Sequence, residues 1–326
     1  MKTAYTGEEA AQAMRGLLGP VTEWTPLTGG EVSQAFAFRA DGRDLVLRLA
    51  PRRDGFDRDA WAAARLRDTP VPVPEVVHVG PVGEDSAGDS TERHGTFACV
   101  SERVAGEHLT GADPEVQRRM APAVRALVED IAAVDLDGTA GFGSFDPATG
   151  RAPHGTWAAQ LRALLPESWD GLGHPEDAAM AAELADTAHG IAAGLPEVRK
   201  LIHGDLGPDN FLVRDDRIAG VFDWEAAMFG DPLWELARYV LWAPAMPSTR
   251  VQADHDLDLL AGEPGIEERL RCLVIVNGLW ALEFYRASGQ AGPMEFMLNR
   301  LNGFRGPTLP VDTGRQDYWM RIGRRR

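Results

Sequence analysis

The amino-acid sequence predicts an α+β protein with two lobes, the first a five-stranded antiparallel lobe and the second mainly helical. Short, partly alternating apolar segments separated by glycine-containing turns fill residues 1–103. Apolar residues at spacings of three and four, the period of a helix face, dominate residues 104–326. One β-rich island at 201–225 interrupts the helical part. We therefore expect two domains, 1–103 and 104–326.

The first lobe opens with a helix and continues with strands. Thr6 and Glu9 stand three residues apart ahead of Ala10, which is the capping-box pattern at the start of a short amphipathic helix. A second helix is expected at 56–66, and the polar stretch 83–95 is interpreted as a hairpin loop. Five strands are expected, at 25–28, 34–39, 45–49, 75–79 and 96–100.

The second lobe is predicted to be a series of helices. Val116, Met120 and Val124 recur on one helix face, which predicts a core-facing helix at 116–134. The apolar stretch 272–285 is too short to span a membrane and is interpreted as part of a buried helix. Further helices are expected at 156–165, 175–193, 232–242, 266–288 and 294–302.

Charge and composition exclude several classes of function. The 326 residues include 49 acidic and 33 basic ones, and the net charge is −16. Such a surface repels phosphates, so no nucleic-acid or membrane partner is expected, whereas a cationic partner would be attracted. Only Lys2 and Lys200 are lysines, and neither follows a glycine, so a Walker-type phosphate loop is excluded.

The two cysteines favour a reducing compartment. Cys99 and Cys272 lie far apart inside apolar runs, so we expect buried free thiols and no disulfide or metal site. A charged and then apolar leader is not expected from the first residues. A cytoplasmic protein is therefore predicted. Its oligomeric state is left open, with a monomer favoured.

The island carries residues suited to phosphoryl transfer. This reaction needs a carboxylate that orients the attacking hydroxyl and accepts its proton, and oxygen ligands for Mg²⁺. Asp205 is followed five residues later by Asn210, and Asp223 comes after a predicted β-hairpin, which is the spacing found in protein kinases. We predict that Asp205 is catalytic and that Asn210 and Asp223 hold the metal. The alternative is that these residues stabilise their turns, with His203 as a structural histidine.

A kinase also needs a cover and a positive charge for the nucleotide phosphates. Ser33 follows Gly29-Gly30 between the first two strands, where its hydroxyl could reach a phosphate, although Gly-Gly is equally typical of a plain hairpin turn. Arg48 stands on the third strand in place of the kinase lysine and can bind phosphate in a forked geometry. Asp59 on the next helix either orients Arg48 or is a surface charge.

Several stretches together carry a resemblance to a known family. The most informative is Ala227-Met228-Phe229-Gly230-Asp231, and the others are 30–38, 46–48, 54–56, 72–76 and 141–145. With these residues the chain resembles the aminoglycoside phosphotransferase family, small-molecule kinases with a protein-kinase-like bilobal fold, from Leu27 to about Leu282. Within the family the resemblance is strongest to the enzymes that phosphorylate hygromycin B. Two departures are the arginine in place of lysine at position 48 and the aspartate in place of glutamate at position 59.

The resemblance implies roles for the lobes and for further residues. Residues 1–103 would be the nucleotide-binding lobe, and 104–326 would carry the catalytic loop and the acceptor site. The backbone of Ser101 and Arg103 would bind the adenine of ATP, with GTP not excluded, and Mg²⁺ would be required. Asp231 and Glu235 would mainly brace the catalytic loop. No activation-loop control is expected, because no Ala-Pro-Glu element follows Asp223.

The acceptor is expected to be a hydroxyl of a cationic aminoglycoside or aminocyclitol antibiotic, so that the enzyme would confer resistance. Asp209, Glu225 and Glu235 are its candidate contacts. Other acids and aromatic residues are read either as acceptor contacts or as a solvated face and core: Asp254, Asp256, Asp258, Glu283, Trp157, Trp169, Trp224, Trp234, Trp242 and Trp280. Two alternatives stay open. One is a kinase of the same fold acting on another small hydroxyl compound, such as a nucleoside or peptide antibiotic, a macrolide, choline or homoserine. The other is a non-catalytic nucleotide-binding regulatory protein.

Overall fold

The computed structural model describes residues 5–27, 33–82 and 96–306. The chain forms two compact units, Met1–Glu107 with Asn210–Ala226, and His108–Asp209 with Ala227–Arg326. The chain thus returns to the first unit for Asn210–Ala226, inside the stretch predicted to form the second lobe. The assignment of a nucleotide-binding lobe to 1–103 and an acceptor lobe to 104–326 remains a prediction.

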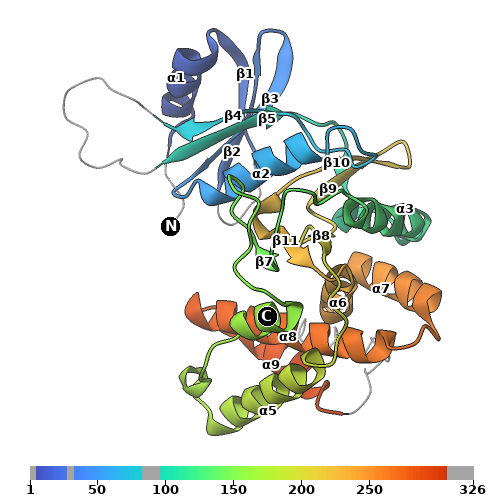
Figure 1. The fold of residues 1–326 in the computed structure, drawn as a ribbon. Helices are drawn as coiled ribbons and strands as arrows, with labels where there is room; N and C mark the ends of the chain where they lie inside the picture. Colours follow the sequence, from blue (N-terminus) through green and yellow to red (C-terminus); the bar gives the residue numbers. More distant parts are fainter. Residues whose placement is uncertain (1–4, 28–32, 83–95, 307–326) are drawn as a thin grey trace. The chain divides into compact units, whose positions relative to one another are not determined.

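The first unit is built on a five-stranded antiparallel sheet in the order β1-β2-β3-β5-β4 (Figure 1). All five predicted strands and both predicted helices are present. A smaller sheet in the order β10-β9-β6 contains the predicted hairpin of the island, which is followed by the short helix η3. The elements are α1 (Gly7–Leu18), β1 (Val21–Leu27), β2 (Gln34–Ala40), β3 (Arg43–Ala50), α2 (Asp54–Arg65), β4 (Val76–Pro81), β5 (Phe97–Glu102), β6 (Glu107–His108), β9 (Phe211–Arg214), β10 (Arg217–Val221) and η3 (Trp224–Ala226).

The alternation of side chains along β3 separates core from site. One face packs with α1 in a buried cluster that includes Leu45, Leu47, Leu49, Ala10 and Met14. Successive side chains of a strand point to opposite faces, so Arg48 lies on the other face. There Phe56 of α2 and Cys99 of β5 are buried with Ala50. The sheet therefore presents Arg48 on the α2 side.

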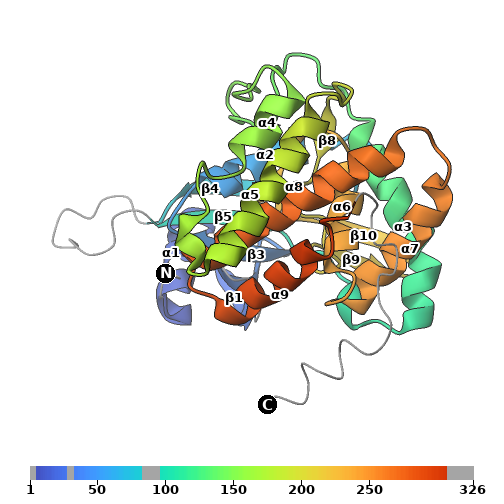
Figure 2. The ribbon, with the colours of Figure 1, turned by 90° about the horizontal axis from the view of Figure 1, so that it is seen from below.

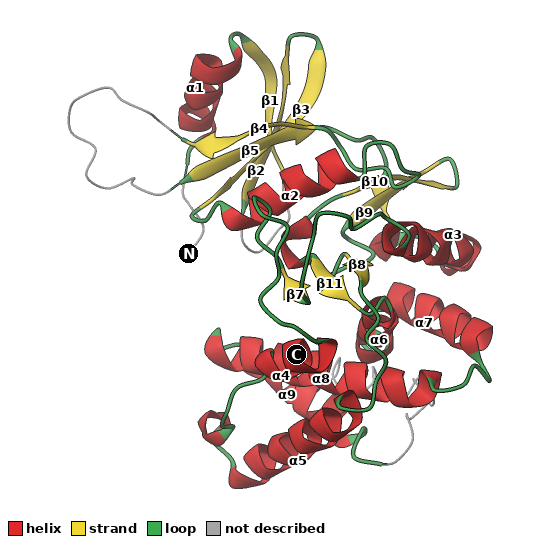
Figure 3. Ribbon diagram, viewed as in Figure 1, coloured by secondary structure: helices red, strands yellow, loops and turns green. Residues whose placement is uncertain are grey.

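The second unit is mainly helical, with one small antiparallel sheet in the order β7-β11-β8 (Figure 3). The helix α6 packs against α7 and α8, and α3 packs against α7. The elements are η1 (Leu109–Gly111), α3 (Pro114–Ala132), β7 (Gly143–Ser144), α4 (Trp157–Ala163), η2 (Asp170–Leu172), α5 (Pro175–Ala192), β8 (Lys200–Ile202), β11 (Met228–Gly230), α6 (Leu233–Trp242), α7 (Pro247–Leu260), α8 (Ile266–Ala287) and α9 (Ala291–Asn302).

The central helix of the second unit is α8. It packs against α5, α6 and α9, and Figure 2 shows α5, α8 and α9 beside one another. Of the apolar stretch 272–285 that was predicted to be buried, residues 272–279 are all buried, whereas Phe284 is 51% exposed. Within the described part of the chain, no helix combines the length and apolar character needed to cross a membrane. Both cysteines are buried and free, so the prediction of buried free thiols at Cys99 and Cys272 is confirmed.

Two parts of the second unit were not predicted. The helix α7 occupies residues for which the sequence suggested only an acidic run. The strands β7, β8 and β11 are only two or three residues long, too short to give an alternating pattern. The loop predicted at 83–95 and Gly29-Gly30 of the predicted phosphate cover lie outside the described residues.

Candidate active site

The segment that follows β8 forms a tight turn around Asp205. His203 is fully buried, and Gly204 has φ +84°, which a glycine adopts without strain. The N–H of Gly207 donates to the carbonyl of Asp205 at 2.7 Å, and the N–H of Asp205 points to His203 Nδ1 at 3.4 Å. The backbone therefore turns sharply and leaves the Asp205 side chain 45% exposed.

Residues in the first turns of α6 form hydrogen bonds with the backbone of this loop. The carboxylate of Glu235 accepts the N–H of Gly204 at 2.7 Å and the N–H of Leu206 at 3.2 Å. The indole N–H of Trp234 donates to the Gly204 carbonyl at 3.1 Å. Glu235 is 2% exposed, and burial raises the pKa of its carboxyl. These bonds fit the bracing role expected for Glu235 better than a contact with an acceptor.

The start of α6 is fixed in turn by Asp231. Its carboxylate accepts the N–H of Leu233 at 3.1 Å and binds the guanidinium of Arg269 at 2.8 and 3.0 Å. Asp231 is 1% exposed. Because a bidentate arginine–carboxylate pair has a fixed geometry, it holds Asp231, and with it the first turn of α6, in place. This arrangement fits the structural role expected for Asp231.

Asn210 directly precedes β9 and Asp223 follows β10, so both residues lie at the open end of the β9–β10 hairpin, within the first unit. The N–H of Phe222 donates to the carbonyl of Asn210 at 3.1 Å, which continues the antiparallel pairing by one residue pair. Asp223 follows directly, with φ +68° and a side chain that is 50% exposed. Aspartate tolerates the left-handed region, and Asp215 and Asp216 in the β9–β10 turn also adopt it, so this φ fits a tight bend after β10. Asn210 and Asp223 thus flank the open end of the hairpin, and their role as metal ligands stays a prediction.

Arg48 and Asp59 form a largely buried ion pair, so the predicted pairing is present. Arg48 Nη2 contacts Asp59 Oδ2, and the side chains are 19% and 6% exposed. Asp59 Oδ1 also accepts the N–H of Trp224 at 2.8 Å, and Arg48 Nη1 lies 3.7 Å from Asp223 Oδ1. Burial is the largest single influence and lowers the pKa of the Arg48 guanidinium, but the charges of Asp59, Cys99 and Asp223 and the hydrogen bond to Asp59 together raise it. Arg48 also lies over the ring of Phe56 at 5.3 Å.

The other residues predicted to contact the nucleotide are Ser33, Ser101 and Arg103, and the structure shows only where they lie in the first unit. Ser33 stands directly before β2 and is half-buried. Ser101 lies in β5, opposite Val46 of β3 and Val76 of β4. The N–H of Arg103 donates to the carbonyl of Asp44 at 2.9 Å, so this N–H is engaged within the first unit. Adenine contacts from Ser101 and Arg103 stay predictions.

Two of the three candidate acceptor residues belong to the second unit and one belongs to the first. Asp209 is exposed at the end of the Asp205 loop in the second unit, and Glu235 is buried under that loop. Glu225 belongs to the first unit, where its backbone carbonyl accepts a hydrogen bond from Arg58 at 2.7 Å and its side chain lies against Gly55. Their roles toward an acceptor stay predictions.

The other acids and tryptophans that were considered as acceptor contacts lie in different environments. Asp254 pairs with Arg250, and Glu283 pairs with Arg286, whereas Asp256 is 1% exposed and bonded to Gln252. Four of the tryptophans are buried in the core, as the core interpretation expects, namely Trp157, Trp169, Trp224 and Trp234.

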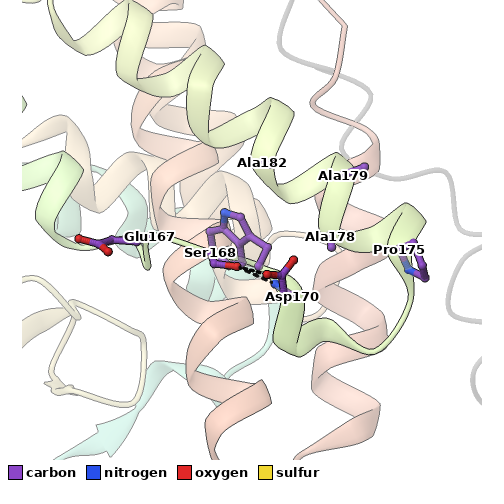
Figure 4. A pocket seen from close by; sticks show the side chains of 8 residues that line it. Glu167, Ser168, Asp170, Pro175, Ala178, Ala179 and Ala182 are labelled. Carbon is purple, nitrogen blue, oxygen red and sulfur yellow. Dashed lines mark hydrogen bonds between the residues drawn. The ribbon is translucent and has the colours of Figure 1, made fainter.

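A surface pocket of about 410 Å³ lies between η2 and the start of α5 (Figure 4). Its lining includes Trp169, Asp170 and Ala178, and Ser168 Oγ donates to Asp170 Oδ2 at 2.8 Å. Trp169, considered above as a possible acceptor contact, lines this pocket, whereas none of the described residues predicted for catalysis, metal or nucleotide does.

One residue at the site was missed from the sequence. Arg238 of α6 contacts the carboxylate of Asp205, Nη2 to Oδ1. The signal was available, because Arg238 follows Glu235 by three residues and such residues share a helix face.

The family model described as "Phosphotransferase enzyme family" (APH) matches residues 23–268, which is more than half of the chain. The chain belongs to this phosphotransferase enzyme family. The phosphotransferase is 32% identical over 266 residues to Hygromycin-B 4-O-kinase of Escherichia coli, across 79% of this chain and 73% of the relative.

Two solved structures show the same relationship. A thermostable mutant of aminoglycoside phosphotransferase APH(4)-Ia, in ternary complex with AMP-PNP and hygromycin B, matches with a TM-score of 0.82 and 29% identity, over 91% of this chain and 97% of that chain. The crystal structure of APH(4)-Ia matches with a TM-score of 0.83 and 27% identity, over 95% and 100% of the two chains. The predictions of the family, the α+β two-lobed fold and a small-molecule phosphotransferase are confirmed.

Proposed function

We propose that this phosphotransferase moves the γ-phosphoryl group of ATP to a hydroxyl of hygromycin B or a closely related aminocyclitol antibiotic. The observation that carries this proposal is the 32% identity to Hygromycin-B 4-O-kinase, together with the likeness to APH(4)-Ia bound to AMP-PNP and hygromycin B. The net charge of −16 supports a cationic acceptor. Expression of the protein would then protect cells from hygromycin B.

In the proposed reaction, the acceptor oxygen forms a bond to the γ-phosphorus as the bond to the β–γ bridging oxygen breaks, and ADP leaves. Asp205 accepts the proton of the acceptor hydroxyl and orients its oxygen. Arg48 binds phosphate oxygens through a guanidinium that Asp59 holds in place. Ser33 would contribute a hydroxyl to the phosphates.

Mg²⁺ is part of the proposal, and the residues fit it. Asn210 and Asp223 offer an amide and a carboxylate oxygen at one end of the hairpin, and Mg²⁺ prefers such oxygen ligands. Within the described part of the chain, no cluster of three or more His, Cys, Asp or Glu forms a metal site. Two protein ligands are sufficient for a kinase, since phosphates and water complete the shell. The metal would neutralise phosphate charge.

The finer expectations also belong to this proposal. A monomeric enzyme is part of this proposal. Two buried free cysteines fit a cytoplasmic location. ATP is the proposed donor, since the similar structure holds an ATP analogue, and GTP is an outcome that the assay below distinguishes.

The test is a transfer assay with radiolabelled ATP or GTP over hygromycin B, other aminoglycosides, nucleoside and peptide antibiotics, macrolides, choline and homoserine. Labelled hygromycin B supports the proposal. Transfer only to another member assigns a different acceptor to the same fold. A thermal shift with Mg-ATP and no transfer to any member would instead favour a regulatory nucleotide-binding protein.

The role of Asp205 has its own test. Asp205→Ala is expected to lower kcat by about 10³-fold while nucleotide affinity changes little, because general-base catalysis is worth about 10²–10⁴-fold. Asp215→Ala, an exposed aspartate of the β9–β10 turn, is the matched control and should keep wild-type turnover. If Asp205→Ala kept wild-type kcat, the assignment of Asp205 would be wrong.

A further inference from the structure

The carboxylate of Asp205 lies on a partly exposed turn, and its orientation matters for the proposed reaction. Its side chain is 45% exposed, and Glu235, which accepts the N–H groups of Gly204 and Leu206, and Trp234, which donates to the Gly204 carbonyl, hold the backbone and not the carboxylate. An aspartate side chain has several staggered rotamers, and backbone bracing alone does not choose among them. A general base must keep its oxygen within hydrogen-bond reach of the acceptor hydroxyl.

Arg238 supplies that partner. Its Nη2 contacts Asp205 Oδ1, and its side chain is only 18% exposed, much less than that of Asp205. Arg238 stands three residues after Glu235 and four after Trp234 on α6, so one helix reaches both the backbone and the side chain of the loop. The helix is anchored through Asp231 to Arg269 of α8. The arginine is therefore the fixed member of the pair.

We propose that Arg238 is a positioning residue for the phosphotransferase reaction, which holds the carboxylate of Asp205 in the orientation that receives the acceptor proton. The role depends on the proposed function of Asp205 as the base. Arg238 acts through Asp205 and needs no contact with nucleotide. Its loss should therefore lower kcat and leave the KM for ATP nearly unchanged.

The test compares Arg238→Met, Arg238→Lys and Arg238→Ala in the full-length protein, with kcat, the KM for ATP and the urea midpoint measured for each. We expect Arg238→Met to lower kcat by about 10²-fold, the cost of misplacing a reacting group by about 1 Å, with the KM for ATP within about twofold of wild type. Arg238→Lys should recover part of the loss, because lysine keeps the charge without the fork. Millimolar guanidinium should partly restore Arg238→Ala and have no effect on Asp205→Ala.

The matched control is Arg250→Met, which removes an arginine paired with an exposed aspartate, Asp254, on α7. It should keep wild-type kcat. If Arg238→Met does not fold, Arg238→Gln replaces it with the same expectation. A wild-type kcat for Arg238→Met would overturn the proposal, as would a kcat loss that only parallels lost stability and is rescued neither by lysine nor by guanidinium.

The failure of the proposed function gives a different pattern. If the wild type does not label hygromycin B, the acceptor is wrong, and the same variants are measured with whichever acceptor the wild type labels. If the wild type labels an acceptor and Asp205→Ala keeps full turnover, the role of Asp205 fails and the proposal for Arg238 fails with it. Loss of turnover in Asp205→Ala but not in Arg238→Met would overturn the proposal for Arg238 alone.

Discussion

The two units each present a charged group through an arginine–aspartate pair, and the pairs are built in opposite ways. In the first unit the aspartate is the buried member, with Asp59 at 6% and Arg48 at 19% exposure. In the second unit the arginine is the buried member, with Arg238 at 18% and Asp205 at 45% exposure. The more exposed partner is in each case the one predicted to meet the substrates. A buried partner therefore serves as a support, and its charge is opposite to that of the group it presents.

The two supporting residues, Asp59 and Arg238, also differ in the other contacts that they make. Asp59 accepts the N–H of Trp224 in addition to binding Arg48, so it joins β3 to the segment that follows Asp223. In the second unit the work is divided, because Glu235 and Trp234 hold the backbone of the loop while Arg238 contacts its side chain. Removing one support in the first unit should thus damage structure and function together. In the second unit, by contrast, damage to the structure and damage to the function should occur separately, because different residues hold the backbone and the side chain.

Asp59→Ala should have the largest effect on stability. It leaves Arg48 without its buried partner and the N–H of Trp224 without an acceptor, which costs about 3 kcal/mol of unfolding free energy by analogy with other broken buried pairs. The measurement is urea unfolding. Asp57→Ala, on the same helix but in an exposed pair with Arg53, should cost less than about 1 kcal/mol. Equal losses in the two variants would contradict the supporting role of Asp59.

Arg48→Met should act mainly on the nucleotide. A charged hydrogen bond is worth about 2 kcal/mol, so the KM for ATP should rise about 30-fold. The KM for the acceptor should change little. Arg43→Met, on the same strand and paired with exposed Glu75 and Glu102, is the control and should leave the KM for ATP unchanged. A similar rise in both variants would show that charge alone, and not the position of Arg48, matters.

Trp234→Phe should have a smaller effect in the second unit. It removes the indole N–H that donates to the Gly204 carbonyl, which costs about 1 kcal/mol and lowers kcat about fivefold. Trp157→Phe is the control, because its indole N–H is buried without a partner among the described residues. That variant should destabilise the protein through lost packing and keep its kcat. No difference in kcat between the two variants would argue against bracing by Trp234.

The last prediction concerns the reactivity of the two cysteine thiols, for which only slow reaction is expected in the folded protein. Burial raises the pKa of the Cys99 thiol, which lies beside Arg48, to about 11 and that of the Cys272 thiol to about 12. Since the thiolate is the reactive form, both should react very slowly with a thiol reagent at pH 8 in the folded protein and rapidly in urea. Rates should rise with pH as the thiolate forms. Rapid modification of Cys99 in the folded protein would mean that water reaches the region behind Arg48.

Local patterns predicted the parts of the fold that depend on neighbouring residues. The capping box is present as expected, with Thr6 and Glu9 exchanging hydrogen bonds. The alternation along β3 placed Arg48 opposite the leucines, and the turn-flanked strands of the island gave the hairpin of Asn210 and Asp223. These features follow from side-chain period and turn chemistry, which are written in short stretches of sequence.

The helix α7 shows where such patterns fail. The acids at 254, 256 and 258 were read as acceptor contacts or as a solvated face, yet residues two apart on a helix point about 200° away from each other. Asp254 and Asp258 are exposed on one side, and Asp256 is 1% exposed on the other, bonded to Gln252 and His255. Only the packing of α7 on α3 and α6 shows that this acid is inside.

The sequence by itself identified the family and the phosphotransferase chemistry, and it predicted Asp205, Asn210, Asp223, Arg48 and Asp59 as site residues, because spacing along the chain carries that information. The tertiary structure decided which residues support them. Arg238 is 33 residues away from Asp205, and Trp224 is 165 residues away from Asp59. Helix spacing puts Arg238 on the same face as Glu235, but that Arg238 contacts Asp205 depends on how distant segments of the chain fold together.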